Sequence, residues 1–272
     1  MLSFRKSKHH IRYNIESNHM KNLSTPFCRI GRKTPIQDTI IRMKPNDYKT
    51  YIEPFVGSGA IYFKLQNDPD KVKSVLNDKD KIVSMGFRLL KTNPTGDIEK
   101  FNNMSVPTLN TYVKSTQSGN LNNLAKAIII QCGTFGSKGT GKIFNQAGIY
   151  NKMKKVVRGD YKDYMKNTIV TSTDYKQVIR KYDNKDAFLF LDPPYEGSDN
   201  LYKDGGDILD ELAKVLNTVK GKFLLTLNDS TRVRKLFSKY KIRGLSVRGG
   251  GSNNNISSIG RATRRELIIT NY

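Results

Sequence analysis

The residues best suited to chemistry lie in one short segment, Leu-Asp-Pro-Pro-Tyr at 191–195. It follows an unbroken apolar run at 187–190, which is typical of a strand buried on both faces of a sheet. The prolines cannot donate backbone hydrogen bonds, so they end the strand and leave Asp192 at its carboxyl end, where α/β proteins bind ligands. The carboxylate, the backbone carbonyls and the ring of Tyr195 could hold a planar group that carries an NH₂. The alternative is a strand followed by a proline turn that Asp192 merely caps.

A second segment, 51–65, predicts a strand that runs into a Gly-x-Gly turn at Gly57 and Gly59 and then directly into a helix. Glycines let the backbone turn sharply and approach a ligand closely. A further strand is predicted at 74–77, and Asp78 follows it. This acid comes about 20 residues after the glycines, the spacing at which nucleotide-binding folds place an acid for ribose hydroxyls. The alternative is that Asp78 or Asp80 merely caps the helix that follows, predicted at 81–90.

The composition is strongly basic. The 272 residues include 47 Lys and Arg against 24 Asp and Glu, which gives a formal net charge of +23. Such an excess indicates a polyanionic partner, with DNA the expected one. A genome biased toward Lys-rich and Asn-rich proteins would produce the same composition. We expect a flexible polar stretch at 248–251 and 253–255; Arg248 at its start and Arg261 after it are candidate nucleic-acid contacts.

Several other classes of protein are disfavoured by composition. Cys28 and Cys132 are the two cysteines, so we expect neither a disulfide framework nor a paired zinc site. The three histidines, at positions 9, 10 and 19, all lie near the start, which disfavours a histidine-based catalytic centre. The sequence has neither a membrane-length apolar run nor the apolar core of a signal peptide. We therefore expect a soluble intracellular protein that binds no metal, either a monomer or a weak homodimer.

The remaining sequence predicts an α/β core interrupted by an insertion. Further strands are predicted at 168–171, 223–227 and 267–270, and helical segments alternate with the strands, which indicates a mainly parallel sheet. The periodicity loosens between about 91 and 164, where a Gly-rich and Lys-rich loop follows a buried helix at 124–130.

That loop, at 133–142, lacks the Gly-Lys-Ser/Thr ending of a Walker loop. We expect Lys138 and Lys142 to lie against phosphates, and a plain surface linker is the alternative.

The two main segments, in this order and with an irregular insert between them, closely resemble the Dam-like class of adenine-N6 DNA methyltransferases, which use S-adenosylmethionine. Glu-Pro-Phe-Val-Gly-Ser-Gly at 53–59 and Asp-Pro-Pro-Tyr at 192–195 carry the resemblance. Weaker matches are Gly-Arg-Lys at 31–33, Asn-Asp at 77–78, Asp-Tyr at 174–175 and Glu-Leu-Ile-Ile-Thr-Asn at 266–271. Arg29-Ile30 and Arg32 depart from the family's Gly-Gly-Lys turn, which bears on the methionine end of the cofactor pocket.

The resemblance covers roughly residues 25–272 and implies a Rossmann-like methyltransferase sheet, mainly parallel with an antiparallel last strand. It divides the chain into a basic flexible extension, a catalytic and cofactor-binding core, and an inserted, mainly helical target-recognition region. These parts are expected at 1–23, at 24–90 with 165–272, and at 91–164.

The resemblance also implies site residues. Asp192, Pro193, Pro194 and Tyr195 would form the catalytic pocket around a flipped adenine. Asp78 would bind the ribose of S-adenosylmethionine, Asp174 its adenine amino group, and Lys33 would lie near its methionine end. The full set implied to bind the cofactor is Lys33, Glu53, Pro54, Phe55, Gly57, Gly59, Asp78, Asp174, Tyr175 and Asp192. Two alternatives stay open at this point: methylation of RNA, and a nucleic-acid-binding protein that keeps the fold but has lost catalysis.

Overall fold

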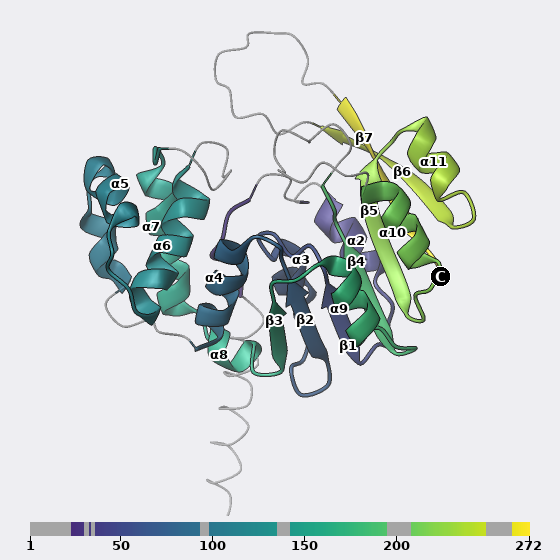
Figure 1. Ribbon diagram of the computed structural model, residues 1–272, viewed down its shortest axis with the longest axis horizontal. Coiled ribbons are helices and arrows are strands. Elements are labelled where there is room, and N and C mark those ends of the chain that lie inside the picture. The colour runs from purple at the N-terminus through teal and green to yellow at the C-terminus, as the bar shows by residue number, and fades with distance from the viewer. Residues whose placement is uncertain are drawn as a thin grey trace, which may run out of the picture.

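The structure is a computed structural model, and it describes residues 23–29, 33, 36–92, 98–134, 142–194, 208–248 and 263–272. A seven-stranded sheet with the order β3-β2-β1-β4-β5-β7-β6 forms its centre (Figure 1). The strands are β1 (Thr50–Glu53), β2 (Lys73–Asn77), β3 (Thr168–Thr171), β4 (Ala187–Leu191), β5 (Lys222–Asn228), β6 (Lys241–Arg248) and β7 (Thr263–Thr270).

The strand directions confirm the predicted fold class. The first five strands in chain order pair in parallel, whereas β7 lies antiparallel between β5 and β6. Consecutive residues of β4 face opposite sides of the sheet: Phe188 and Phe190 join one apolar cluster, Leu189 and Leu191 the other. This burial on both faces explains why the strand is an unbroken apolar run.

One expectation about the chain near Arg248 is wrong. The polar stretch was expected to be flexible from this residue onward, but β6 extends through Arg248, which pairs with Thr263 of β7. The eight-residue antiparallel ladder pairs the backbone groups of β6 that face β7. Its alternation of Lys241, Ile242 and Arg243 suits an edge strand that is buried on one face.

Helices cover both faces of the sheet. Beneath one face, side chains of α9, α10 and α11 meet the sheet, and on the other face those of α2, α3 and α4 do so. Their bounds are α2 (Gln37–Met43), α3 (Ala60–Leu65), α4 (Lys81–Thr92), α9 (Tyr175–Tyr182), α10 (Ile208–Leu216) and α11 (Thr231–Leu236). In the part of the chain that is described, no helix is long and apolar enough to cross a bilayer.

The region between α4 and β3 is helical and gathers beyond α4, at the β3 edge of the sheet (Figure 1). Apolar residues of its helices, among them Leu109, Ile128 and Met153, belong to the same buried cluster as Phe87 of α4. The insertion therefore shares its hydrophobic core with one face of the sheet. Its elements are η2 (Ile98–Asn103), α5 (Val106–Lys114), α6 (Asn120–Gly133), α7 (Gln146–Arg158) and α8 (Tyr161–Tyr164).

Residues 23–29 run between the insertion and the glycine turn. The Thr25 hydroxyl donates to the Ser58 carbonyl within that turn. The Lys152 ammonium of α7 donates to the Thr25 carbonyl at 2.9 Å. This short segment thus contacts both the insertion and the loop that follows β1. The remainder of the expected N-terminal extension, residues 1–22, lies outside the described residues.

The expectation that the cysteines form no disulfide is also wrong. Cys28, in the N-terminal segment, is bonded to Cys132 near the end of α6, and their Cα atoms are 4.9 Å apart. The two residues are separated by 104 positions in the sequence, and packing of the N-terminal segment against α6 brings them together. Such a pairing depends on tertiary structure, so cysteine spacing alone could not predict it.

Candidate active site

The candidate site lies where the parallel strands end. Asp192 directly follows β4, and the Gly57 turn directly follows β1, which pairs with β4. Asp78 directly follows β2, on the other side of β1. Because these strands are parallel, all three segments meet at one edge of the sheet, the edge at which α/β proteins bind ligands.

Asp192 is held by two side chains from distant parts of the sequence. Its Oδ1 atom lies 2.8 Å from the Lys33 ammonium and accepts a hydrogen bond from the Thr226 hydroxyl at 2.9 Å. Burial raises the pKa of the Asp192 carboxyl, while Lys33 and Thr226 act in the opposite direction. Beside it, Pro193 is buried and Pro194 is half-buried. Tyr195, predicted to stack on the target base, lies outside the described residues.

Lys33 contacts a second acid as well. Its side chain is only 4% exposed, and its ammonium lies 4.0 Å from Oε2 of Glu266 on β7. Thr226 is the residue of β5 that reaches Asp192, and Ile268 is its cross-strand partner on β7. One buried ammonium, two carboxylates and one hydroxyl therefore lie close together at the ends of β4 and β5, beside β7.

The glycine turn depends on glycine at both predicted positions. Gly57 and Gly59 have φ angles of 49° and 69°, in the left-handed region that other residues rarely adopt. A Cβ at Gly59 would also lie 2.6 Å from Cζ of Phe87, so a larger residue would displace that ring. The backbone N–H of Gly57 donates to Oδ2 of Asp78 at 2.9 Å, so the acid holds the turn in place.

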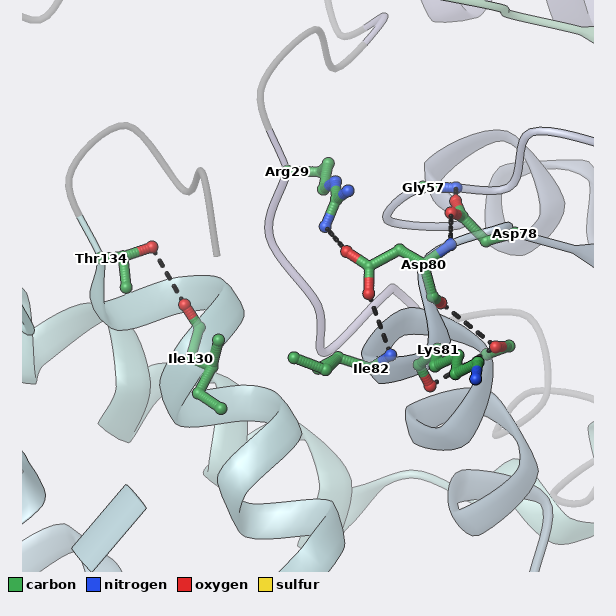
Figure 2. Close-up of polar contacts among 9 residues, drawn as sticks. Arg29, Gly57, Asp78, Asp80, Lys81, Ile82, Ile130 and Thr134 are labelled. Atoms are coloured by element: carbon green, nitrogen blue, oxygen red, sulfur yellow. Dashed lines mark hydrogen bonds and ion pairs between the residues drawn. The ribbon is translucent and has the colours of Figure 1, made fainter. Parts of the chain in front are cut away.

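Asp80, rather than Asp78, satisfies the first turn of α4. Oδ1 of Asp80 accepts from the backbone N–H of Ile82 at 2.9 Å, while Oδ2 pairs with the Arg29 guanidinium at 2.7 Å. Figure 2 shows Asp78 turned toward Gly57 and Asp80 turned toward Arg29 and the helix. Burial raises the pKa of the Asp78 carboxyl, and the nearby Arg29 charge opposes that shift. Asp78 thus faces the turn instead of serving as a simple helix cap.

Asp174, predicted at the adenine of the cofactor, and Tyr175, predicted as a cofactor-binding residue, lie together after β3. Asp174 is the N-cap of α9, where it accepts from the backbone N–H of Lys176 at 2.8 Å. The ring of Tyr175 lies 5.1 Å from that of Phe55, measured between centroids. The hydroxyls of Tyr175 and Ser172 are buried and have no hydrogen-bond partner among the described residues. This apolar pair with nearby polar atoms suits the ring of a nucleoside.

Glu53 and Pro54 are buried beneath this edge. Glu53 is only 2% exposed and accepts a hydrogen bond from the Tyr51 hydroxyl at 2.8 Å. Burial raises the pKa of Glu53 well above its ordinary value, and the neighbouring charges of Asp192 and Asp78 raise it further. Glu53 therefore adds a further acid to a site that already contains Asp78, Asp192 and Glu266. Because burial favours its protonated form, Glu53 adds a hydrogen-bonding group to the site rather than a negative charge.

The predicted nucleic-acid contacts are not gathered at one place. Lys142 is exposed in the insertion, next to the isolated bridge between Thr134 and Ile143. Arg248 ends β6 at the opposite edge of the sheet, and its side chain is not described. Lys138 and Arg261 lie outside the described residues. Among the residues that are described, no group of three or more His, Cys, Asp or Glu side chains could hold a metal ion.

Sequence reasoning did not single out two residues of this cluster, Thr226 and Glu266, as site residues. Thr226 is the one polar residue within the apolar run 223–227, and it is completely buried. Glu266 is 1% exposed and leads into the apolar run 267–269. A polar residue in a buried strand needs a partner, and this requirement was the signal that could have identified both.

Comparison with known proteins agrees with this geometry. Residues 30–247 match the family described as D12 class N6 adenine-specific DNA methyltransferase. Type II methyltransferase M.CviBI of Paramecium bursaria Chlorella virus NC1A is 24% identical in an alignment 212 residues long that covers 72% of this chain and 79% of that protein. Type II methyltransferase M1.LlaDCHI of Lactococcus lactis subsp. cremoris is 25% identical in an alignment 281 residues long that covers 91% of this chain and 95% of that protein.

Among solved structures, the comparison found a match to that of PH0851. The match covers 88% of this chain and 45% of that one, at 10% identity and a TM-score of 0.33, so it carries no weight here. The family match spans most of the sequence and includes both the glycine turn and the Asp-Pro-Pro-Tyr segment. The chain therefore belongs to the D12 class of N6 adenine-specific DNA methyltransferases.

Proposed function

We propose that this chain transfers a methyl group from S-adenosylmethionine to the N6 amino group of an adenine flipped out of duplex DNA. The observation that carries the proposal is the position of Asp192, at the end of β4 and in contact with Lys33 and Thr226. An adenine inside a duplex cannot reach a carboxylate at the edge of a sheet, so the base must leave the stack.

The cofactor residues suit S-adenosylmethionine, which carries a positive sulfonium and a nucleoside. Asp78, directly behind the Gly57 turn, offers a carboxylate to the ribose hydroxyls. Phe55 and Tyr175 offer ring faces to the adenine, and Asp174 offers a carboxylate to its amino group. When bound, the cofactor supplies the electrophilic methyl group, and the protein supplies orientation and electrostatics.

The catalytic residues would act on the target amino group. The Asp192 carboxylate and the Pro193 carbonyl accept its two hydrogens, which keeps the nitrogen lone pair from delocalising into the ring. Tyr195 stacks on the flipped base and holds it in the plane that these acceptors require. Pro194 fixes the backbone after Pro193, because its ring restricts φ.

DNA would be held mainly through its phosphates. The insertion at 91–164 is the proposed target-recognition region, since it packs against α4, the helix that follows Asp78 and Asp80. Lys138 and Lys142 of the insertion, together with Arg248 and Arg261, are the proposed phosphate contacts. The net charge of +23 favours this mode of binding.

The direct test is methyl transfer from labelled S-adenosylmethionine to duplex DNA, with single-stranded RNA of matched sequence as the comparison. We expect label in DNA, and digestion of the product should yield N6-methyladenine. Label in RNA alone would replace the DNA assignment with RNA methylation. Tight DNA binding with no transfer to either nucleic acid would show a binding protein that has lost catalysis.

A further inference from the structure

Glu266 is a buried acid for which the proposed chemistry has no direct use. It lies on β7 opposite Asn228 of β5 and is 1% exposed. A carboxylate this deeply buried is costly unless a charge or hydrogen bonds compensate it. Its Oε2 atom lies 4.0 Å from the ammonium of Lys33, the same ammonium that contacts Asp192.

The two contacts to Asp192 fall on one of its oxygens. Lys33 and Thr226 both approach Oδ1, at 2.8 Å and 2.9 Å. Within the described part of the chain, no donor contacts Oδ2, so that oxygen is available to the hydrogen of an amino group. Asp192 can therefore be held by the protein and still accept a hydrogen bond from a substrate.

How strongly Asp192 accepts a hydrogen bond depends on how strongly the Lys33 ammonium attracts its negative charge. An ammonium has three donors and one charge, and here two carboxylates share it. If Glu266 were neutral, the ammonium would be drawn more strongly toward Asp192. Its remaining oxygen would then carry less effective negative charge and would polarise a target amino group less.

We propose that Glu266 is a positioning residue that holds Lys33 between two carboxylates and so keeps Asp192 a strong hydrogen-bond acceptor. The inference rests on the proposed function, because it assumes that Asp192 receives the target amino group. Glu266 on β7 thus takes part in the active site through its contact with Lys33, without contacting the substrate.

The ionisable groups that face Asp192 come from three parts of the fold. Lys33 approaches from the N-terminal segment, Glu53 from β1 and Glu266 from β7. Lys33 lowers the pKa of the Asp192 carboxyl, and Glu266 raises it. Removing the charge of Glu266 should therefore lower the pKa of Asp192, because a neighbouring negative charge is lost.

The test is Glu266→Gln, which keeps the shape of the side chain and removes its charge. Carbon-13 NMR of labelled aspartate carboxyls in the ligand-free protein follows the titration of Asp192, and Asp192→Asn identifies its signal. We expect the pKa of Asp192 to fall in Glu266→Gln. The matched control is Glu211→Gln, which neutralises an exposed acid paired with Lys176. An unchanged Asp192 titration, or an equal shift in the control, would overturn the proposal.

Kinetics provide the second measurement. In Glu266→Gln the acid limb of the rate profile should move to lower pH, and the maximal rate should fall about tenfold, less than the loss expected for a group that touches the substrate. Glu266→Asp keeps the charge, so the pKa of Asp192 should stay closer to that of the parent. This variant also provides the test if Glu266→Gln folds poorly. If the parent protein transfers no methyl group, the proposed function is refuted. The titration of the ligand-free protein would still decide whether Glu266 and Asp192 share Lys33.

Discussion

The backbone N–H of Gly57 donates a hydrogen bond to the carboxylate of Asp78 at 2.9 Å. The other oxygen of that carboxylate accepts from the backbone N–H of Asp80, also at 2.9 Å. One side chain thus links the turn after β1 to the segment after β2. The acid proposed to bind the ribose is therefore also the acid that shapes the loop beside it.

Asp78→Asn is expected to weaken S-adenosylmethionine binding. The amide would lose the charge, and it would present a donor to one of the two backbone N–H groups that the carboxylate now accepts. Each lost hydrogen bond to a charged group is worth about 1.5–3 kcal/mol, which corresponds to a loss of affinity of roughly 10- to 150-fold. Calorimetry measures the change. Asp70→Asn, at an exposed acid paired with Lys166, is the control and should bind like the parent.

The salt dependence of DNA binding tests the proposed phosphate contacts. If about six phosphates are neutralised, the slope of log affinity against log salt should be near −5. The double variant Lys138→Ala, Lys142→Ala should flatten this slope by about two units if both residues touch phosphate. The control is Lys181→Ala with Lys185→Ala, two exposed residues that precede β4 and so lie away from the edge that carries Asp192. A parent affinity that is independent of salt would contradict the electrostatic mode of binding.

The disulfide should make the stability of the protein sensitive to reductant. It joins residues separated by 104 positions, and a cross-link of this kind typically stabilises a protein by about 2–4 kcal/mol, mainly by restricting the unfolded chain. We expect a reductant to lower the free energy of unfolding in urea by that amount. Cys28→Ser with Cys132→Ser should resemble the reduced parent and should not respond to reductant. If the oxidised and reduced parent unfold at the same urea concentration, the bond does not stabilise the fold.

Glu53→Gln is expected to stabilise the protein at high pH relative to the parent. The folded state raises the pKa of Glu53, so folding favours the protonated acid, and its contribution is lost as pH rises through the folded pKa. Glutamine does not ionise and therefore avoids this loss. Thermal unfolding should show a larger advantage of Glu53→Gln at pH 8 than at pH 5. Glu211→Gln, at an exposed acid, should show the same small difference from the parent at both values of pH.

Local sequence patterns predicted the elements that carry the site. The apolar run 187–190 is buried on both faces of the sheet, so its composition alone indicates a central strand. The turn at Gly57 and Gly59 was predictable because left-handed backbone favours glycine strongly. Asp192 and Asp78 could be placed because each directly follows a predicted strand.

The features that sequence did not predict depend on contacts between distant segments. β6 alternates basic and apolar residues. It is defined as a strand by its pairing with β7, from which a polar stretch separates it in the sequence. The contact of Lys33 with Asp192 and Glu266 joins three segments that are far apart in the chain. The bond between Cys28 and Cys132 likewise forms because the N-terminal segment packs on α6.

The part played by Tyr195 can be separated from that of Asp192 by their expected effects. Tyr195→Ala should weaken capture of the flipped base, because base–aromatic stacking is worth about 1–3 kcal/mol. The fluorescence of 2-aminopurine at the target position reports that capture, and the chain has no tryptophan to interfere. Asp192→Asn should leave the same signal close to that of the parent, since it keeps the size of the side chain.

Asp192→Asn should instead abolish most of the chemistry. Oδ1 of asparagine can still accept from Lys33 and Thr226, so the amide NH₂ takes the place of the Oδ2 atom that would face the target amino group. An N–H of the asparagine amide then faces an N–H of the target amino group, and the negative charge that polarises the target nitrogen is lost. We expect the methylation rate to fall by at least about 10²-fold, with little change in affinity for cofactor or DNA. Asp210→Asn, at an exposed acid paired with Arg232, is the control. If Asp192→Asn methylates adenine as fast as the parent, Asp192 does not bind the target amino group.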